Sequence, residues 1–415
     1  MKKIVQAWTG ISLVQRIVAG LVIGALLGMF VPSEGGIAIL GDVFVGALKA
    51  IAPLLVFFLV ISSLCYAGKS HGGVIRTVII MYMFSTFLAA IVAVTASSAF
   101  PVTLTLVDAA TDMAAPQGVA EVLRTLLMNV VTNPVQSLVS ANYIGILVWA
   151  VLIGIALRKA SDTTKQSLND ISAALSKTVT WIIQCAPFGI MGLVYNTVSV
   201  NGLSTFTEYG KLLAVLLGSM LFIYFVTNPI LVFWCIRKNP YPLIFKCLKK
   251  SAITAFFTRS SAANIPINME ACAEMGLDKD TYSVTIPLGA TINMDGAAIT
   301  ITVMTLAAAH TLGIAVDIPS AIILSILATL SACGASGVAG GSLLLIPMAC
   351  SLFGISNDIA MQVVGVGFII SVLEDACETA LNSSSDVLFT ATAEFAERRK
   401  NGTLKAEDMV PKDEH

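Results

Sequence analysis

The chain has 415 residues, 56% hydrophobic and only 12% charged, with a formal net charge of −1. Soluble domains carry about twice that charged fraction, so the composition indicates a polytopic membrane protein. The near-neutral charge argues against nucleic acid as a partner. The eight cysteines are scattered singly, without a Cys-x-x-Cys pair, which excludes a zinc motif of that kind.

Apolar stretches of about 20 residues or more predict membrane spans, because a helix of that length crosses the hydrocarbon core. They cover residues 12–30, 42–66, 75–100, 125–157, 178–200, 211–236, 281–311 and 359–395. Asn133-Pro134 interrupts the fourth stretch, which we therefore expect to be broken. The fifth stretch contains Pro187.

Two further stretches, 243–271 and 319–353, have apolar arms around a small, polar centre. The first centre holds Thr258-Arg259-Ser260-Ser261, and the second is the Gly- and Ser-rich run 331–342. Non-helical backbone at membrane depth must be buried in protein or line a wet cavity. We therefore expect re-entrant hairpins rather than the alternative, two ordinary helices with small-residue packing faces. Paired interrupted segments point to a midplane binding site in transporters.

Lys and Arg gather in alternate loops, which predicts cytoplasmic positions for those loops and for both termini. These residues are Lys2, Lys3, Arg16, Lys69, Arg76, Arg158, Lys159, Lys165, Arg237, Lys238, Lys246, Lys249, Lys250, Arg398, Arg399 and Lys400. The intervening loops at 107–117 and 201–209 hold acids and no bases. The polar residues 401–415 are expected to form a mobile tail.

The C-terminal spans are rich in acids and hold no bases. Not one Lys or Arg occurs between Lys279 and Arg398, although the region contains Asp295, Glu374, Asp375, Glu378 and Asp386. Carboxylates at membrane depth are costly and usually belong to ion pairs or to ion and substrate paths. Compensating charge must come from another segment, from protons or from bound cations. This favours a cation-coupled carrier.

The last predicted helix carries its polar residues on one face. Asp375, Glu378, Thr379, Asn382 and Asp386 are spaced at +3, +4, +7 and +11, which places them within an arc of roughly 100°. An interfacial amphipathic helix is the alternative, but its polar face would favour Lys and Arg, and none occurs here. We therefore expect this face to line a binding site.

The segment 291–296, Thr-Ile-Asn-Met-Asp-Gly, lies within a predicted span and follows Pro287 and Gly289. These breakers favour local unwinding. Free carbonyls with Asn293 and Asp295 oxygens are hard ligands, which suit Na⁺ or a similar cation. The alternative is a protonated aspartic acid, hydrogen-bonded in the core.

Three motifs together indicate a family. With Thr-Arg-Ser-Ser at 258–261, Asn-Met-Asp-Gly at 293–296 and Asp-x-x-x-Thr-x-x-Asn-x-x-x-Asp at 375–386, the chain resembles the dicarboxylate/amino acid:cation symporters, the glutamate transporter group. The resemblance covers nearly the whole chain and is strongest to bacterial carriers that couple serine and threonine to sodium.

The resemblance implies an all-α fold of eight membrane helices plus two re-entrant hairpins, assembled as a homotrimer in the bacterial inner membrane. Residues 1–240 would form a trimerisation scaffold and contribute their third and sixth helices to a transport domain. Residues 241–400, with both hairpins and the last two helices, would form the core of that domain. The domain would move as a unit, like an elevator, across the lipid bilayer.

The resemblance also implies the binding residues. Asp375 would take the α-ammonium of the substrate and Asn382 its α-carboxylate, helped by Ser261 and the Val338 backbone. Ser260, Glu378 and Thr379 complete the substrate set. The resemblance implies three cation sites. The first has Asn293, the Asn382 backbone and Asp386 as ligands, and the second has Tyr82, Ser85, Thr86 and Asp295. The third has Thr291 and the second hairpin tip, and Gly289 also belongs to the implied cation ligands.

Glu378 stands where acidic amino-acid carriers of this family have an Arg that clamps the side-chain carboxylate of the substrate. Unless Glu378 is protonated, two negative charges at about 4 Å and an effective dielectric near 20 would repel by roughly 4 kcal/mol. That is on the order of a thousandfold in affinity. We therefore expect Na⁺-coupled uptake of serine and threonine, with Glu378 accepting a hydrogen bond from the substrate hydroxyl. Ala262, Ala263 and Ala339 also depart from the acidic carriers, which leaves the cation count open.

A proton- or sodium-coupled carrier of dicarboxylates or acidic amino acids is the alternative within transport. An intramembrane hydrolase that pairs Asp295 with Asp375 and a substrate-independent ion channel are alternatives from other classes. No flanking catalytic motif supports the hydrolase, so we do not expect an enzyme.

Overall fold

The computed structural model describes residues 11–31, 36–66, 72–106, 128, 131–202, 205–333 and 340–404. Within these ranges the chain forms helices and no strand. Among the described residues, five helices are long and apolar enough to cross a membrane, or six if a pair bent by 55° counts as one span. The structure therefore confirms a polytopic, all-α membrane protein.

The first part of the chain forms several long helices and also the shorter helices α6 and α7. They are α2 (Leu13–Phe30), α3 (Ala38–Tyr66), α4 (Gly72–Ala99), α6 (Pro134–Val139), α7 (Tyr143–Ala156), α8 (Asp162–Gln184), α9 (Ala186–Asn201), α10 (Thr205–Phe222) and α11 (Asn228–Ile236). A π-helical turn, Ile223–Thr227, joins α10 to α11.

The predicted break near residue 133 is confirmed. Asn133 caps α6, because its side-chain oxygen accepts the N–H groups of Val135 and Gln136 at 2.9 and 3.1 Å. The span predicted over 178–200 is broken at Cys185, and its helix starts earlier than predicted. Its helix begins at Asp162 and ends at Gln184, and α9 continues at an angle of 55°. The first turn of α9 holds Pro187, which cannot donate to the turn before it.

The remaining helices form the C-terminal half. They are α12 (Tyr241–Cys247), α13 (Ile253–Thr258), α14 (Ser261–Glu274), α15 (Lys279–Ile292), α16 (Asp295–Thr311), α17 (Ile318–Ala332), α18 (Ile346–Ser351) and α19 (Asn357–Lys400). A π-helical turn, Leu248–Ala252, joins α12 to α13, and a short 3-10 turn, Leu343–Leu345, precedes α18.

The first predicted hairpin is present as two helical arms with a sharp turn between them, and its re-entrant position stays a prediction. The chain reverses at Arg259, whose φ is 52°, and Ser260 then caps α14 by accepting the Ala263 N–H at 3.2 Å. Below the tip, the amide nitrogen of Asn264 lies 3.0 Å from the Ser251 hydroxyl and 2.9 Å from that of Ser383. These bonds join the two arms to each other and to α19.

The second hairpin has α17 as its first arm and the segment up to α18 as its second. Its tip, residues 334–339, lies outside the described residues, and so does Val338. The described chain resumes at Gly340, which has a φ of 71° that a glycine adopts without strain.

The predicted unwinding between α15 and α16 is confirmed. Asn293 has φ −95° and ψ 84°, and Met294 has φ −124° and ψ 51°, so neither is helical. The helical axis is therefore interrupted in the middle of a buried segment. Asp295 becomes the first residue of α16, where the N-terminal end of a helix favours negative charge.

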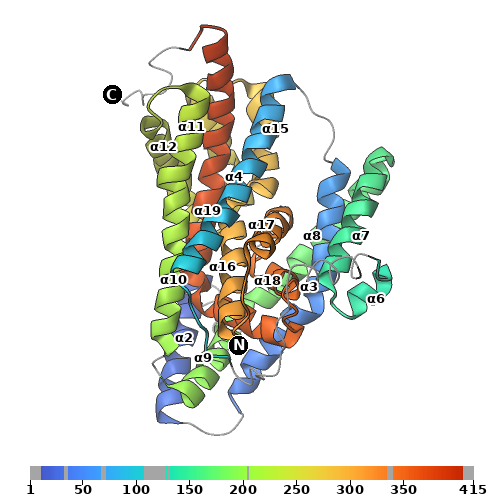
Figure 1. The fold of residues 1–415 in the computed structure, drawn as a ribbon, viewed down its shortest axis with the longest axis vertical. Coiled ribbons are helices and arrows are strands. Elements are labelled where there is room, and N and C mark those ends of the chain that lie inside the picture. The colour runs from blue at the N-terminus through green and yellow to red at the C-terminus, as the bar shows by residue number, and fades with distance from the viewer. Residues whose placement is uncertain are drawn as a thin grey trace.

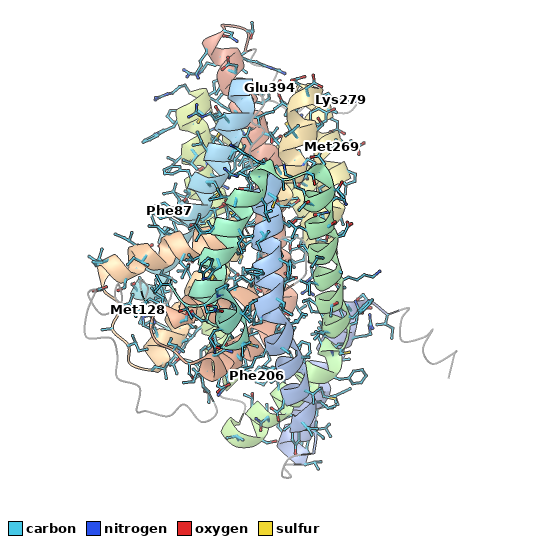
Figure 2. The ribbon with its side chains drawn as sticks, turned by 90° about the vertical axis from the view of Figure 1, so that its right-hand side faces the viewer. Phe87, Met128, Phe206, Met269, Lys279 and Glu394 are labelled. Atoms are coloured by element: carbon cyan, nitrogen blue, oxygen red, sulfur yellow. The ribbon has the colours of Figure 1, made fainter. Side chains whose placement is uncertain are left out.

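The helices pack in two groups. Figure 1 shows α4, α10, α11 and α19 side by side along the long axis, whereas α3, α6 and α7 stand on one flank. Figure 2 shows Glu394 and Lys279 at one end of the molecule and Phe206 at the opposite end. The long helix α19 touches elements of both hairpins, which places its polar face at the centre of the C-terminal half.

Helices α2 and α9 approach at backbone distance. Gly20, Gly24 and Gly28 recur every fourth residue on α2, and a Cβ atom at Gly20 or Gly24 would lie only 2.1 or 2.4 Å from a carbonyl oxygen of α9. Such small-residue spacing is typical of close helix pairs in membranes. The stripe makes this pair a tightly fitted unit within the N-terminal half.

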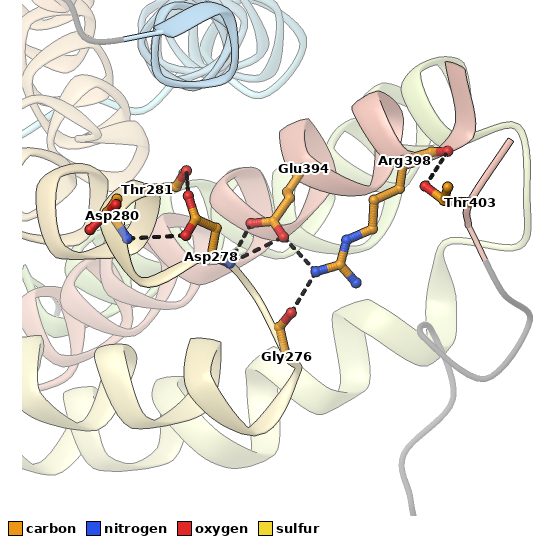
Figure 3. A network of polar contacts seen from close by, with 7 residues as sticks. All are labelled: Gly276, Asp278, Asp280, Thr281, Glu394, Arg398 and Thr403. Atoms are coloured by element: carbon orange, nitrogen blue, oxygen red, sulfur yellow. Dashed lines mark hydrogen bonds and ion pairs between the residues drawn. The ribbon is translucent and has the colours of Figure 1, made fainter. Parts of the chain in front are cut away.

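A polar network fastens the turn between α14 and α15 to the end of α19 (Figure 3). The Glu394 carboxylate accepts the Asp278 N–H at 2.9 Å and a guanidinium N–H of Arg398 at 2.5 Å. Arg398 also donates to the Gly276 carbonyl oxygen at 2.5 Å. The first hairpin and the unwound helix are thus joined to α19 at their common end.

Candidate functional site

The polar face of α19 points into the protein. Asp375, Glu378, Thr379, Asn382 and Asp386 are each no more than 6% exposed. The interfacial-helix alternative required these side chains to face water, so their burial excludes it. The predicted face is therefore enclosed by other elements, and each of its carboxylates needs partners from them.

Asp375 is paired with a base from the first hairpin tip. The Nε atom of Arg259 lies 2.6 Å from Oδ2 of Asp375, and both side chains are largely buried. The Gly340 N–H donates to Oδ1 of the same carboxylate at 3.0 Å. The expected compensating charge thus comes from another segment, and both hairpins meet α19 at this residue.

Asn293, at the end of α15, and Asp386, one helical turn beyond Asn382 on α19, form a second group. The amide nitrogen of Asn293 lies 2.9 Å from Oδ1 of Asp386 and 3.2 Å from the Asn382 carbonyl oxygen. Its own Oδ1 atom and Oδ2 of Asp386 are buried without a hydrogen-bond partner. Buried oxygens are nearly always partnered, so this cluster of oxygens fits a hard cation such as Na⁺.

Gly289 and Tyr82 complete this group. A Cβ atom at Gly289 would lie 2.6 Å from Oδ1 of Asp386 and 2.8 Å from the Tyr82 hydroxyl oxygen. That hydroxyl lies 3.1 Å from the Asp386 carbonyl oxygen and 3.1 Å from the Thr390 hydroxyl. The structure therefore places Tyr82 with Asp386, whereas the resemblance grouped it with Asp295.

Asp295 collects two hydroxyls from α4. The Ser85 hydroxyl donates to Oδ2 at 2.7 Å and the Thr86 hydroxyl to Oδ1 at 3.1 Å. The adjacent Gly296 N–H donates to the side-chain oxygen of Asn382 at 2.7 Å. The structure thus brings three of the four expected residues of this site together and connects them to the α19 face.

A third group was not found from the sequence. Glu374, one turn before Glu378 on α19, is fully buried, and its Oε1 lies 2.5 Å from the Thr300 hydroxyl of α16. The same hydroxyl lies 2.9 Å from Oε2 of Glu378, which also accepts from Ser342 at 2.8 Å. The spacing of Glu374 and Glu378 signalled a shared helix face, but nothing in the sequence marked Thr300 as their partner.

Comparison with known proteins identifies the family of this chain. Residues 13–394 match the model of the sodium:dicarboxylate symporter family. The chain belongs to this family. It is 57% identical over 402 residues to a Streptococcus thermophilus protein named serine/threonine transporter SstT, covering 97% of this chain and 100% of the relative. A protein of the same name from Streptococcus agalactiae is 57% identical over 395 residues, which cover 95% of this chain and 98% of that relative.

Several residues expected from this symporter family have other positions or no polar contact with the groups above. The Thr291 hydroxyl donates to the Leu288 carbonyl oxygen of its own helix at 2.7 Å. Ser260 caps α14, and Ser261 is buried at the start of that helix. The third cation site therefore stays a prediction, since the hairpin tip that would complete it lies outside the described residues.

Proposed function

We propose that this protein imports serine and threonine together with Na⁺. The observation that carries the proposal is the place of Glu378, which is buried on the face that also holds Asp375 and Asn382 and takes no part in the ion pairs of the described Lys and Arg side chains. A carboxylate at that point disfavours an acidic side chain on the ligand, because like charges repel strongly in a buried site. The similarity to proteins named serine/threonine transporter supports the same substrates.

The ligand is held by its charged ends. Asp375 accepts the α-ammonium, since a carboxylate offers about four lone-pair positions and Arg259 and Gly340 occupy only two of them. Asn382 and the first hairpin tip, with Ser260 and Ser261, receive the α-carboxylate, together with the Val338 backbone. Thr379 and Glu378 lie beside the side chain, where Glu378 accepts its hydroxyl hydrogen.

Sodium binding prepares this site. Asn293, the Asn382 carbonyl oxygen and Asp386 form one cation site with Gly289 and Tyr82 around it, and Ser85, Thr86 and Asp295 form another. Asn382 belongs to the ligand site and, through its carbonyl oxygen, to the cation site. A cation that fixes Asn382 therefore favours the conformation that binds the amino acid, which couples the two binding events without covalent chemistry.

The proposal includes the architecture that the family implies. Residues 1–240 supply a trimeric scaffold and two helices of the transport domain, and residues 241–400 supply the rest of that domain, which moves through the lipid like an elevator. Both termini are cytoplasmic in the bacterial inner membrane. Arg398, Arg399 and Lys400 form the last turn of α19, at the end where Figure 2 labels Glu394. A cytoplasmic position of that end agrees with the usual excess of basic residues on the cytoplasmic side.

Uptake into proteoliposomes tests this function. Labelled serine should accumulate with an inward Na⁺ gradient, stop when choline replaces Na⁺ at fixed pH, and be inhibited by threonine but not by aspartate. Uptake that survives choline, or that aspartate inhibits, would favour the proton- or sodium-coupled carrier of acidic substrates. Conductance without substrate would favour a channel.

A further inference from the structure

Two carboxyl groups of α19 share one hydroxyl. Glu374 and Glu378 lie one turn apart, and the Thr300 hydroxyl oxygen lies 2.5 Å from Oε1 of Glu374 and 2.9 Å from Oε2 of Glu378. The exposed fraction of Glu374 and of Thr300 is 0%. Both contacts are within hydrogen-bonding distance, so each needs a hydrogen atom between its two oxygens.

The hydrogen atoms in this group do not suffice for two ionised carboxylates. A hydroxyl has one hydrogen to donate, and an ionised carboxylate has none. The Ser342 hydroxyl is used at Oε2 of Glu378. Oε2 of Glu374 is buried with no donor. One further hydrogen atom, on a carboxyl oxygen, satisfies these contacts.

The surrounding charges do not replace that hydrogen. Asp375 on the same helix adds a negative charge, and its partner Arg259 is already bound to it. On α19 itself, Cys377 is a further titratable residue within one turn of Glu374, while α16 and the segment before α18 contribute the hydroxyls of Thr300 and Ser342. Within the described ranges, the ion pairs of Lys and Arg side chains leave Glu374 and Glu378 out.

We propose that Glu374 and Glu378, which are bridged by Thr300, together bind one proton. Glu374 carries this proton, and serine binds only while Glu374 is protonated. The last part rests on the proposed function. With Glu374 neutral, its carboxyl group donates to the Thr300 hydroxyl oxygen, the Thr300 hydroxyl donates to Glu378, and the pair carries a single negative charge. Glu378 then remains an acceptor for Ser342 and for the substrate hydroxyl. This proton site is separate from the oxygens around Asp386 that fit Na⁺.

Infrared spectroscopy of the purified full-length protein in lipid vesicles tests the proton directly. The difference spectrum of wild type minus Glu374→Gln at neutral pH, in which lipid esters and other acids cancel, should contain the carbonyl stretch of one protonated carboxylic acid. The matched control is Glu397→Gln, which removes an exposed carboxylate from the same helix, and its difference spectrum should lack that band. A Glu374→Gln difference spectrum without the band, or with only an ionised-carboxylate band, would overturn the assignment.

Two further spectra keep the proposal testable if Glu374→Gln folds poorly. Thr300→Val removes the shared hydroxyl and should shift the carboxylic acid band to higher frequency, because the acid loses a hydrogen-bond partner. Added Na⁺ should leave the band of the wild-type protein in place. A band that disappears as Na⁺ is added would show that the pair binds sodium, and would overturn the proton assignment.

Serine titrations at increasing pH test the functional part. Wild-type affinity should weaken in alkaline buffer, by about tenfold per pH unit once the pair loses its proton. Glu374→Gln, which mimics the neutral acid, should bind within about twofold of wild type at neutral pH and keep that affinity in alkaline buffer. Wild-type affinity that stays constant would overturn the link to serine. A protein that does not bind serine at all would refute the proposed function, while the infrared result would still stand.

Discussion

The Nε atom of Arg259 lies 2.6 Å from Oδ2 of Asp375, although the two residues are 116 positions apart in the chain. Arg259 reaches this carboxylate from a backbone conformation with a φ of 52°, which costs roughly 1–2 kcal/mol for a residue with a side chain. The ion pair with Asp375 and the Ser260 cap of α14 at the same tip offset that cost. The ion pair of Asp375, the residue proposed to bind the substrate, therefore depends on the conformation of the first hairpin.

Arg259→Ala should destabilise the protein and weaken serine binding together. Removing one partner of a buried ion pair leaves an uncompensated charge, at a cost of about 3–5 kcal/mol. Thermal unfolding in detergent and serine titration measure the two effects. Arg399→Ala, which truncates an exposed arginine at the end of α19, is the control. Equal behaviour of the two variants would contradict a role for the Arg259 pair.

Glu378→Arg should weaken serine uptake and let aspartate compete. The new guanidinium replaces a repelling charge with an attracting one at the ligand side chain, a change of several kcal/mol in a buried site. Glu374 would attract the same guanidinium, so the double variant Glu374→Gln/Glu378→Arg should favour aspartate more strongly. Competition assays with labelled serine give the ratio. An unchanged preference in both variants would exclude Glu378 as the residue that sets specificity.

Asp386→Ala should abolish the effect of Na⁺ on serine affinity. The side chain supplies both the partner of the Asn293 amide and an unpartnered buried oxygen, so its loss removes a hard cation ligand. Serine titrations in Na⁺ and in choline buffer should give the same affinity for this variant. Asp280→Ala, at an exposed position, should keep the wild-type difference, and a difference retained by Asp386→Ala would refute the cation site.

Gly289→Ala should lower Na⁺ affinity without unfolding the protein. Its Cβ atom would lie 2.6 Å from Oδ1 of Asp386, and the carboxylate must move away to admit it. Helix propensity alone favours alanine by about 1 kcal/mol. Gly210→Ala, where a Cβ atom meets nothing within 4 Å, controls for that gain. We expect Na⁺ affinity to fall by about tenfold or more, and an unchanged affinity would show that the carboxylate does not act from this position.

The sequence predicted those features that local patterns determine. The break at Asn293 and Met294, the turn at Arg259 and the buried face of α19 follow from proline, glycine and helical periodicity within short windows. The start of α8 was missed because residues 162–177 are largely polar, so hydropathy placed the beginning of the span at 178, and the break at Cys185 fell inside the predicted span. The Arg259–Asp375 pair and the Thr300 bridge depend on tertiary contacts between distant segments, which a single sequence does not disclose.

The glycine stripe between α2 and α9 limits where movement can occur. Because the two backbones touch at Gly20, Gly24 and Gly28, a twist or a slide of one helix against the other would drive main-chain atoms into collision. The two helices therefore move as one rigid unit. Any large movement of the half that carries α19 must occur at other contacts, and a single added methyl group at one of these glycines would force the two helices apart.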